Sequence, residues 1–264
     1  MSLIPPVLVL GFGKMGGAMA AGWRARGLSP SFAIDPSTPP SPGPEITVLA
    51  DASGLPADFT PAAVVLAVKP QMAADALPQV ARFGDAVMLS IMAGKTIAGL
   101  RQALGGACVV RAMPNTPAAI GQGITVACAG PGVSAAQRDL CHSLLESVGD
   151  VAWVEDEALI DPVTAISGGG PAYVFLLAEL LEKAALEQGI PADLARLMAR
   201  RTVSGSGALL AASTEDAAQL RRNVTSPKGT TEQALAVLMR DDAWPALVSR
   251  AIEAATERSR QLAG

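Results

Sequence analysis

The sequence predicts an α/β protein, in which an N-terminal domain with a mostly parallel sheet is followed by an all-α C-terminal domain. Short apolar runs alternate with amphipathic stretches up to about residue 155. A glycine-rich turn follows the first apolar run, at Gly11–Gly16. After about residue 157 the strand-like runs stop and long apolar helical stretches replace them. We therefore expect one domain over residues 1–157 and a second over residues 158–264.

The expected strands are short, apolar and bounded by glycine, proline or polar residues. Because helical stretches separate most of them, they should form right-handed βαβ units and a parallel sheet covered on both faces. They are Val7–Leu10, Ser31–Ile34, Ala63–Val68, Ala86–Ser90 and Cys108–Arg111, followed by Gly123–Ala127 and Val151–Val154.

The expected helices of the first domain lie mostly between these strands, while the proline-rich segment Pro36–Pro44 should be a surface loop. In the second domain, the apolar stretch Ala172–Gln188 ends at Gly189 with Pro191 beyond, which is typical of a helix end. The other expected helices are Lys14–Arg26, Gln71–Arg82, Thr96–Leu104 and Ala135–Ser147, then Ala192–Ser213, Glu215–Arg222, Thr231–Met239 and Ala243–Leu262.

The composition argues against several classes of function. Half of the 264 residues are hydrophobic but only 3% are aromatic, so alanine, valine and leucine must supply the core. The net charge is −4 without a basic run, which argues against nucleic acid as a partner. The apolar stretch Val163–Leu181 contains three glycines, a proline and Glu179, which argues against a membrane span.

The N-terminal segment has no positively charged start and reads as a first strand rather than a signal peptide. The cysteines Cys108, Cys128 and Cys141 are odd in number and lack the spacing of metal ligands. We therefore expect three buried, reduced cysteines in a cytoplasmic protein that uses no metal.

The first candidate site is Gly11-Phe12-Gly13-Lys14-Met15-Gly16, a G-x-G-x-x-G motif between an expected strand and an expected helix. The first glycine permits the tight turn, the second lets the backbone approach a pyrophosphate, and the third lets helix and strand pack closely. The helix N-terminus offers free N–H groups and the positive end of its dipole. This context predicts a Rossmann-type domain that binds NADH or NADPH; the alternative is a tight turn that binds nothing.

Asp35 stands 19 residues after Gly16, at the end of the second expected strand. An acid there would accept hydrogen bonds from the adenosine ribose and repel a 2′-phosphate. No lysine or arginine follows until Lys69, so Asp35 favours NADH over NADPH. The alternative is an aspartate that only caps the turn before Pro36.

Three further segments should border the cofactor, because ligands of open parallel sheets lie outside the carboxyl ends of the strands. Each alone would be an ordinary loop, but together they converge on the glycine turn. They are Ala67-Val68-Lys69-Pro70, Ala93-Gly94, and Met113–Pro117 with Asn115.

The second candidate site is the loop within Asn223–Gln233. Thr230 and Gln233 have the spacing of a capping box, so a helix should begin there. Hydroxyls of Ser226, Thr230 and Thr231 would gather with free N–H groups at a positive helix end. Such a cluster can bind a carboxylate without an arginine. The alternative is a well-capped surface helix.

Taken together, the chain resembles the pyrroline-5-carboxylate reductase family over essentially its whole length. The resemblance implies a Rossmann domain followed by a helical dimerisation domain, in homodimers that often assemble further. It also implies reduction of 1-pyrroline-5-carboxylate to L-proline, the last step of proline biosynthesis, with substrate between the nicotinamide and a helical-domain loop. The resemblance rests on Gly11–Gly16, Ala67–Pro70, Ser90–Gly94, Arg111–Pro117, Ser167–Tyr173 and Thr225–Thr231.

Carried over to this sequence, the family's carboxylate site would consist of Ser226, Gly229, Thr230 and Thr231, with Thr231 also approaching the ring nitrogen as the catalytic candidate. Two positions depart from the family pattern: Lys228 stands where a glycine is usual, and Gly169 where a serine is usual. If the family glycine has a positive φ, Lys228 is sterically disfavoured there, or it adds a cation beside the carboxylate. The segment Ala217–Arg222 also lacks the usual Pro-Gly and Asp.

Two other functions are weighed against this one. The first is a related hydroxyacid dehydrogenase or imine reductase. Carbonyl reduction by a hydroxyacid dehydrogenase would need a positioned acid, such as a lysine near the start of the helical domain. Lys183 is the only lysine of that helix and we expect it on an exposed face. A non-enzymatic nucleotide sensor would have no reason to keep the Ser/Thr loop. The only histidine, His142, is expected to have no catalytic role.

Overall fold

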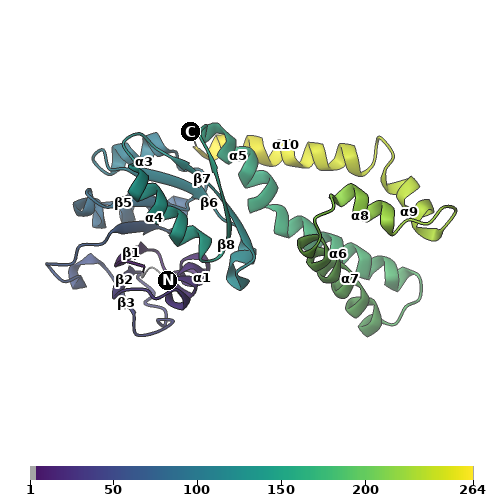
Figure 1. Cartoon of the computed structure of the whole chain (residues 1–264), viewed down its shortest axis with the longest axis horizontal. Coiled ribbons are helices and arrows are strands. Elements are labelled where there is room, and N and C mark those ends of the chain that lie inside the picture. Colours follow the sequence, from purple (N-terminus) through teal and green to yellow (C-terminus); the bar gives the residue numbers. More distant parts are fainter. Residues whose placement is uncertain (1–3, 264) are drawn as a thin grey trace. The chain divides into compact units, whose positions relative to one another are not determined.

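The computed structural model describes residues 4–263. It divides into two compact units (Figure 1): a sheet unit that reaches Gly168 and includes the chain from Ala255 onward, and a helical unit over Gly169–Ala254. The sheet unit holds the candidate cofactor residues, and the helical unit holds the Ser/Thr loop.

In the described residues the sheet has eight strands in the order β3-β2-β1-β4-β5-β6-β7-β8. Neighbours are parallel except β6 and β7, which are antiparallel. This order confirms the expected mostly parallel sheet. The strands are β1 (Val7–Leu10), β2 (Ser31–Ile34), β3 (Ile46–Leu49), β4 (Ala63–Leu66), β5 (Val87–Ser90), β6 (Val109–Met113), β7 (Gly123–Ala129) and β8 (Gly149–Val154).

Side chains of the central strands alternate between two hydrophobic clusters, one on each face of the sheet. Val7 and Val9 belong to one cluster, whereas Leu8 and Leu10 belong to the other. The first cluster includes Trp23, whose Nε1 donates to the carbonyl oxygen of Leu144 at 2.8 Å. Both faces of β1 are therefore buried, which explains why its sequence is continuously apolar.

The helices of the sheet unit begin and end close to the expected residues, except that the short helix at Ile160–Val163 was not expected and one expected helix is wrong. They include α1 (Lys14–Ala25), α3 (Ile97–Ala103), α4 (Ala135–Glu146), α5 (Ile160–Val163) and the last turns of α10 (Trp244–Ala263). The expected helix Gln71–Arg82 is wrong: α2 covers only Ala73–Ala76, between short 3₁₀ turns. Pro78 has no N–H to donate to the preceding turn, so the α-helical hydrogen bonds end there, although Leu77 itself keeps helical geometry with φ −58° and ψ −36°.

Strand β3 was not expected from the sequence. It has four residues at the edge of the sheet, and only Ile46 is fully buried. Its apolar pattern is therefore short, and it comes directly after the proline-rich loop. The cysteine prediction also needs a correction: Cys128 and Cys141 are buried, but Cys108 is only half-buried.

The helical unit consists of α6 (Gly170–Glu187), α7 (Ala192–Ala212), α8 (Ala217–Asn223), α9 (Thr230–Leu238) and the first part of α10. Helices α6 and α7 pack side by side (Figure 1). In these two helices only Ala195 and Ala199 are buried among the described side chains. Large apolar side chains remain exposed, among them Tyr173, Val174, Phe175, Leu176, Leu180, Leu194, Leu197, Leu209 and Leu210.

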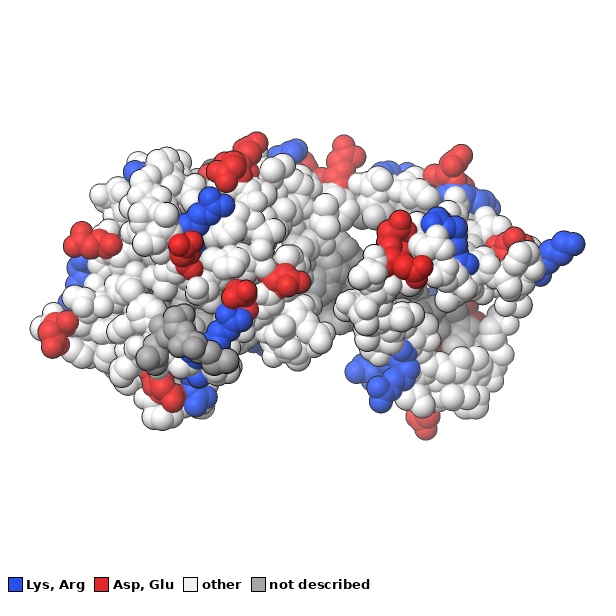
Figure 2. Space-filling model, viewed as in Figure 1, with Lys and Arg blue, Asp and Glu red and all other residues white. Residues whose placement is uncertain are grey.

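Two further observations concern apolar helix and the distribution of charge in the described residues. In the described part of the chain, one helical run, Glu157–Glu187, is long and apolar enough to cross a membrane by length and composition alone. Figure 2 shows basic and acidic side chains interspersed on the visible face, with wide uncharged areas between them. A chain with so much exposed apolar helix requires a covering surface.

Candidate functional site

The glycine turn follows β1 and packs against the end of β4. Gly11 has a φ of +91°, and a Cβ at this position would lie 2.7 Å from the backbone nitrogen of Val68. A Cβ on Gly16 would lie 2.8 Å from the carbonyl oxygen of Gly11. Only glycine fits at either position, so the turn is sharp and α1 begins close to the sheet.

Gly13 has a different environment, because no atom lies within 4 Å of the position of its missing Cβ. It is the N-cap of α1, and no side chain caps the helix there. The first-turn N–H groups of α1, on Lys14 and Met15, thus face a space that a phosphate can enter. The turn therefore leaves open space at the N-terminus of α1, and the binding of a pyrophosphate there stays a prediction.

Asp35 follows β2 and faces the glycine turn. Its Oδ2 accepts a hydrogen bond from the backbone nitrogen of Phe12 at 2.8 Å. Its Oδ1 accepts from the backbone nitrogen of Ser37 at 2.9 Å and from the Ser37 hydroxyl at 2.6 Å. Partial burial raises the pKa of the Asp35 carboxyl, but these hydrogen bonds lower it by more, so the pKa lies below its ordinary value. Asp35 therefore stays ionised at neutral pH.

The remaining cofactor candidates follow the carboxyl ends of β4, β5 and β6. Ala67 and Val68 lie next to Gly11, and Lys69 and Pro70 lead into the short turn before α2. Ala93 and Gly94 form a turn after β5, in which Gly94 has a φ of +66°. Asn115 follows β6, and its Oδ1 accepts a hydrogen bond from the backbone nitrogen of Ile124 at 3.0 Å. The side-chain oxygen of Asn115 thus holds the start of β7 in place.

The Ser/Thr loop lies in the other compact unit and leads into α9. The helix begins at Thr230 with Gly229 as N-cap, and no side chain caps it. The expected capping box of Thr230 and Gln233 is therefore wrong. Instead, the Glu232 carboxylate accepts a hydrogen bond from the backbone nitrogen of Lys228 at 2.8 Å. Because Gly229 is the N-cap, Glu232 is the third residue of the helix, and its side chain reaches back past the N-cap.

Within this loop, Ser226, Gly229 and Thr231 lie close together in sequence around the free end of α9. The Ser226 hydroxyl lies over the α-carbon of Gly229, which leaves no room for a side chain there. Thr231 is half-buried, whereas Ser226 and Thr230 are exposed. Lys228 has a φ of +59°, the left-handed conformation that the family glycine suggested. The loop thus presents hydroxyls and uncapped N–H groups at a helix end.

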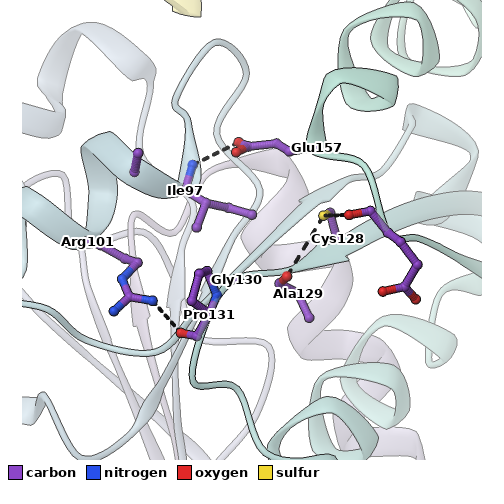
Figure 3. Close-up of a pocket in the computed structure, with 9 residues that line it drawn as sticks. Ile97, Arg101, Cys128, Ala129, Gly130, Pro131 and Glu157 are labelled. Carbon is purple, nitrogen blue, oxygen red and sulfur yellow. Dashed lines mark hydrogen bonds between the residues drawn. The ribbon is translucent and has the colours of Figure 1, made fainter.

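Two features of the sheet unit were not expected from the sequence. A pocket of about 710 Å³ lies beside α3 and β7, with Arg101, Cys128 and Glu157 in its lining (Figure 3). None of the predicted cofactor residues lines it. The second feature is a buried ion cluster around Arg111. The sequence contains one signal for this cluster, which is an arginine inside the otherwise apolar strand β6. A buried charge needs partners, so this arginine indicates acidic residues nearby.

The two other sequence candidates have ordinary surroundings. Lys183 is exposed on α6. His142, on α4, accepts a hydrogen bond at Nδ1 from the indole nitrogen of Trp153 at 3.2 Å. Neither residue lies among the predicted cofactor segments of the sheet unit or in the Ser/Thr loop.

Comparison with known proteins finds relatives over the whole chain. A family model described as pyrroline-5-carboxylate reductase dimerisation matches residues 157–262. A pyrroline-5-carboxylate reductase of Pseudomonas aeruginosa is 38% identical over 268 aligned positions, which cover 98% of this chain and 97% of that protein. The reductase of Corynebacterium melassecola is 34% identical, with 97% and 98% covered.

Solved structures show the same likeness. A pyrroline-5-carboxylate reductase from Coxiella burnetii has a TM-score of 0.85 and 30% identity, covering 98% of both chains. A Plasmodium falciparum pyrroline carboxylate reductase with NADP bound has a TM-score of 0.82 and 28% identity, also covering 98% of both chains. The likeness extends over both compact units.

Proposed function

The chain belongs to the pyrroline-5-carboxylate reductase family, and from this premise we infer that it reduces 1-pyrroline-5-carboxylate to L-proline, the last step of proline biosynthesis. The observation that carries the inference is the identity of 38% with the Pseudomonas aeruginosa reductase over nearly all of both chains. The glycine turn supports it, because its shape fits a dinucleotide pyrophosphate. The protein is accordingly an NAD(P)-dependent oxidoreductase of the C=N group.

The reduced nicotinamide supplies the hydride in such a reaction. The protein must then bind the ring, orient it and exclude water. Ser226, Gly229, Thr230 and Thr231 hold the carboxylate at the N-terminus of α9, where uncapped N–H groups and the helix dipole favour an anion. The Thr231 hydroxyl contacts the ring nitrogen. A protonated imine is already an electrophile, so orientation supplies much of the rate.

NADH is the preferred cofactor in this proposal. The Asp35 carboxylate stays ionised and lies beside the glycine turn, so it attracts the ribose hydroxyls and repels a 2′-phosphate. Ser37 and Phe12 already donate to Asp35, which fixes its orientation before the cofactor binds. No metal takes part in the reaction.

The protein functions as a cytoplasmic homodimer, and we expect the dimers to assemble further, as in the family. Residues 1–157 serve as the nucleotide-binding domain, and residues 158–264 serve for dimerisation and substrate binding. The exposed apolar side chains of α6 and α7 support this assignment, because a second copy can cover them. In such a dimer, the loop at Ser226–Thr231 contributes to the substrate site of its own chain or to that of the partner.

A hydroxyacid dehydrogenase remains the nearest alternative. Reduction of a carbonyl requires a positioned proton donor, and Lys183 is exposed on α6, away from the Ser/Thr loop in sequence. The purified protein should therefore oxidise NADH when the imine acid is added and yield proline. Simple 2-keto acids should be poor substrates. Turnover of a hydroxyacid without any turnover of the imine would reject the proposal.

A further inference from the structure

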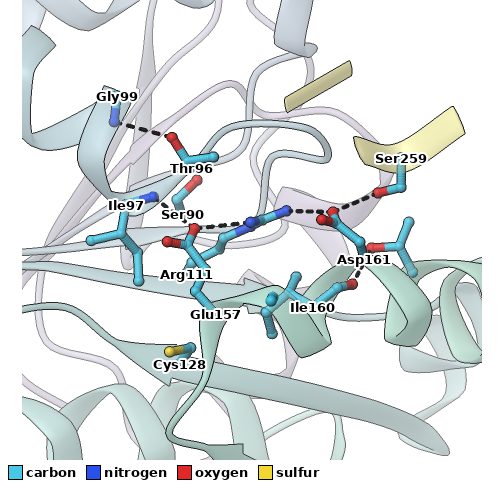
Figure 4. Close-up of polar contacts among 12 residues, drawn as sticks. Ser90, Thr96, Ile97, Gly99, Arg111, Cys128, Glu157, Ile160, Asp161 and Ser259 are labelled. Carbon is cyan, nitrogen blue, oxygen red and sulfur yellow. Dashed lines mark hydrogen bonds and ion pairs between the residues drawn. The ribbon is translucent and has the colours of Figure 1, made fainter. Parts of the chain in front are cut away.

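A buried ion cluster lies under the cofactor edge of the sheet unit. The guanidinium of Arg111 on β6 is 1% exposed. One of its nitrogens contacts Oε1 of Glu157 at 2.9 Å, and another contacts Oδ1 of Asp161 at 3.3 Å (Figure 4). Its Nε has no hydrogen-bond partner within the described residues. One cation thus holds two carboxylates from the segment that follows β8.

Each carboxylate holds a second segment of the chain. The same Oε1 of Glu157 accepts a hydrogen bond from the backbone nitrogen of Ile97, the first residue of α3, at 2.8 Å. The same Oδ1 of Asp161 accepts one from the hydroxyl of Ser259, near the end of α10, at 2.8 Å. Arg111 therefore connects the start of α3 with the end of α10 (Figure 4).

The Ala93-Gly94 turn lies between these two anchored helix ends. Three residues after Gly94 the chain reaches Ile97, which Glu157 holds. On the other side, a Cβ on Gly94 would lie 2.9 Å from Cβ of Leu262 and 3.0 Å from its carbonyl oxygen. Leu262 stands three residues after Ser259, so the Asp161 hydrogen bond fixes the surface against which Gly94 packs.

This turn lies on the nicotinamide side of the cofactor edge. The glycine turn after β1 takes the pyrophosphate, and Asp35 after β2 takes the adenosine ribose. Strands β4 and β5 extend the sheet on the other side of β1. The reacting end of the cofactor is therefore directed toward the segments that follow β4 and β5, which include Ala93 and Gly94.

We propose that Arg111, Glu157, Asp161 and Ser259 form a positioning cluster that holds the Ala93-Gly94 turn in place for the nicotinamide. The proposal rests on the proposed function, since hydride transfer is sensitive to the orientation of the ring. A buried ion pair seldom stabilises a protein more than apolar side chains of similar size. This cluster has a specific geometry that holds two helix ends at once, and apolar side chains would not reproduce that geometry.

The test compares Ser259→Ala with Ser249→Ala, an exposed serine on the same helix that bonds only within its own helix. Amide hydrogen exchange of residues 92–97 is measured in the free protein, together with the NADH dissociation constant. Turnover and the isotope effect with NADH deuterated at C4 are then measured. In Ser259→Ala, amide hydrogen exchange at residues 92–97 should become faster. Turnover should fall roughly two- to tenfold, which corresponds to the loss of one hydrogen bond. NADH affinity should stay within about twofold, while the isotope effect increases.

Ser249→Ala should match the wild type in every measurement, and Glu157→Gln should behave as Ser259→Ala does. If both cluster variants lose stability but keep wild-type exchange at residues 92–97, the cluster is purely structural and the proposal is overturned. A wild type that does not reduce the imine would reject the proposed function alone. Exchange at residues 92–97 would then still decide the positioning role.

Discussion

Asp35 combines a structural contact with a proposed recognition contact. One carboxylate oxygen holds the glycine turn through Phe12, and the other holds the turn that begins at Pro36. The two interpretations offered by the sequence, a turn cap and a ribose ligand, are thus compatible. Because hydrogen bonds lower the pKa of Asp35, its charge is constant across neutral pH. Its contribution to stability is fully present above the ordinary carboxyl pKa and is lost as pH falls through the lower folded value.

Replacement of Asp35 by serine should narrow the preference for NADH over NADPH. Loss of one charged contact corresponds to about 1–2 kcal/mol, a five- to thirtyfold change in the ratio of kcat/KM values. The wild-type preference should not change between roughly pH 6 and pH 8, because the carboxylate does not titrate there. Asp35→Asn is the control, since it keeps an acceptor for Phe12 but removes the charge. A wild type that strongly prefers NADPH would contradict this account of Asp35.

Lys228 occupies a left-handed conformation that disfavours any side chain. Lys228→Gly should therefore be more stable than Lys228→Ala by about 1 kcal/mol in urea unfolding. Both variants lose the ammonium group, so the difference reports the backbone strain of alanine less the extra freedom of glycine in the unfolded chain. If the cation assists carboxylate binding, KM for the imine acid should rise equally in both. An alanine variant more stable than the glycine variant would show that the backbone at this position is unstrained.

At the scale of single elements, the N-terminus of α9 is the feature that we propose to bind the substrate. Thr231→Val should lower turnover with the imine acid far more than it weakens NADH binding. Ser226→Ala should act mainly on KM, because a carboxylate contact is present in both ground and transition states. Each loss of a hydrogen bond to a charged group corresponds to roughly 1.5–3 kcal/mol.

Neither substitution should change the onset of α9, because the helix has no side-chain cap to lose. Circular dichroism and unfolding in urea provide this control. If Thr231→Val kept both turnover and KM within about twofold of wild type, the loop would be structural. The turn at Ala93-Gly94 and the segment at Asn115 would then be the next candidates for the carboxylate.

The elements that the sequence predicts well are those with strong local patterns. Strands β1 and β2 begin and end at the expected residues, because each is a short, mostly apolar run between turn residues. Edge strand β3 and the broken helix at Gln71–Arg82 were missed, because partial exposure and Pro78 weaken the periodicity. Register and strand order depend on long-range packing, which no local pattern records.

The candidate sites divide in the same way. The glycine turn and Asp35 were predictable because a spacing rule connects them. The Arg111 cluster was not, since Glu157, Asp161 and Ser259 are 46, 50 and 148 residues away from Arg111 in sequence. Likewise, the sequence pattern does not show that Gly229, rather than Thr230, takes the extended conformation of the N-cap of α9.

At the scale of the whole molecule, the exposed apolar surface of α6 and α7 predicts an obligate dimer. Phe175 is 67% exposed on α6, and Ile120 is 73% exposed in the sheet unit. Phe175→Asp should weaken the dimer in light scattering at micromolar concentration, whereas Ile120→Asp should leave it intact. The reason is that a charge at the covered surface is desolvated without a partner. An active wild-type monomer would contradict the prediction.

The central claim is that this chain transfers a hydride from reduced nicotinamide to the imine carbon of 1-pyrroline-5-carboxylate. The most direct test supplies NADH deuterated at C4 on the transferred face and analyses the product by mass spectrometry. The account predicts L-proline that carries one deuterium on the former imine carbon, formed in step with NADH oxidation. Proline without deuterium, or oxidation of NADH without proline, would contradict it.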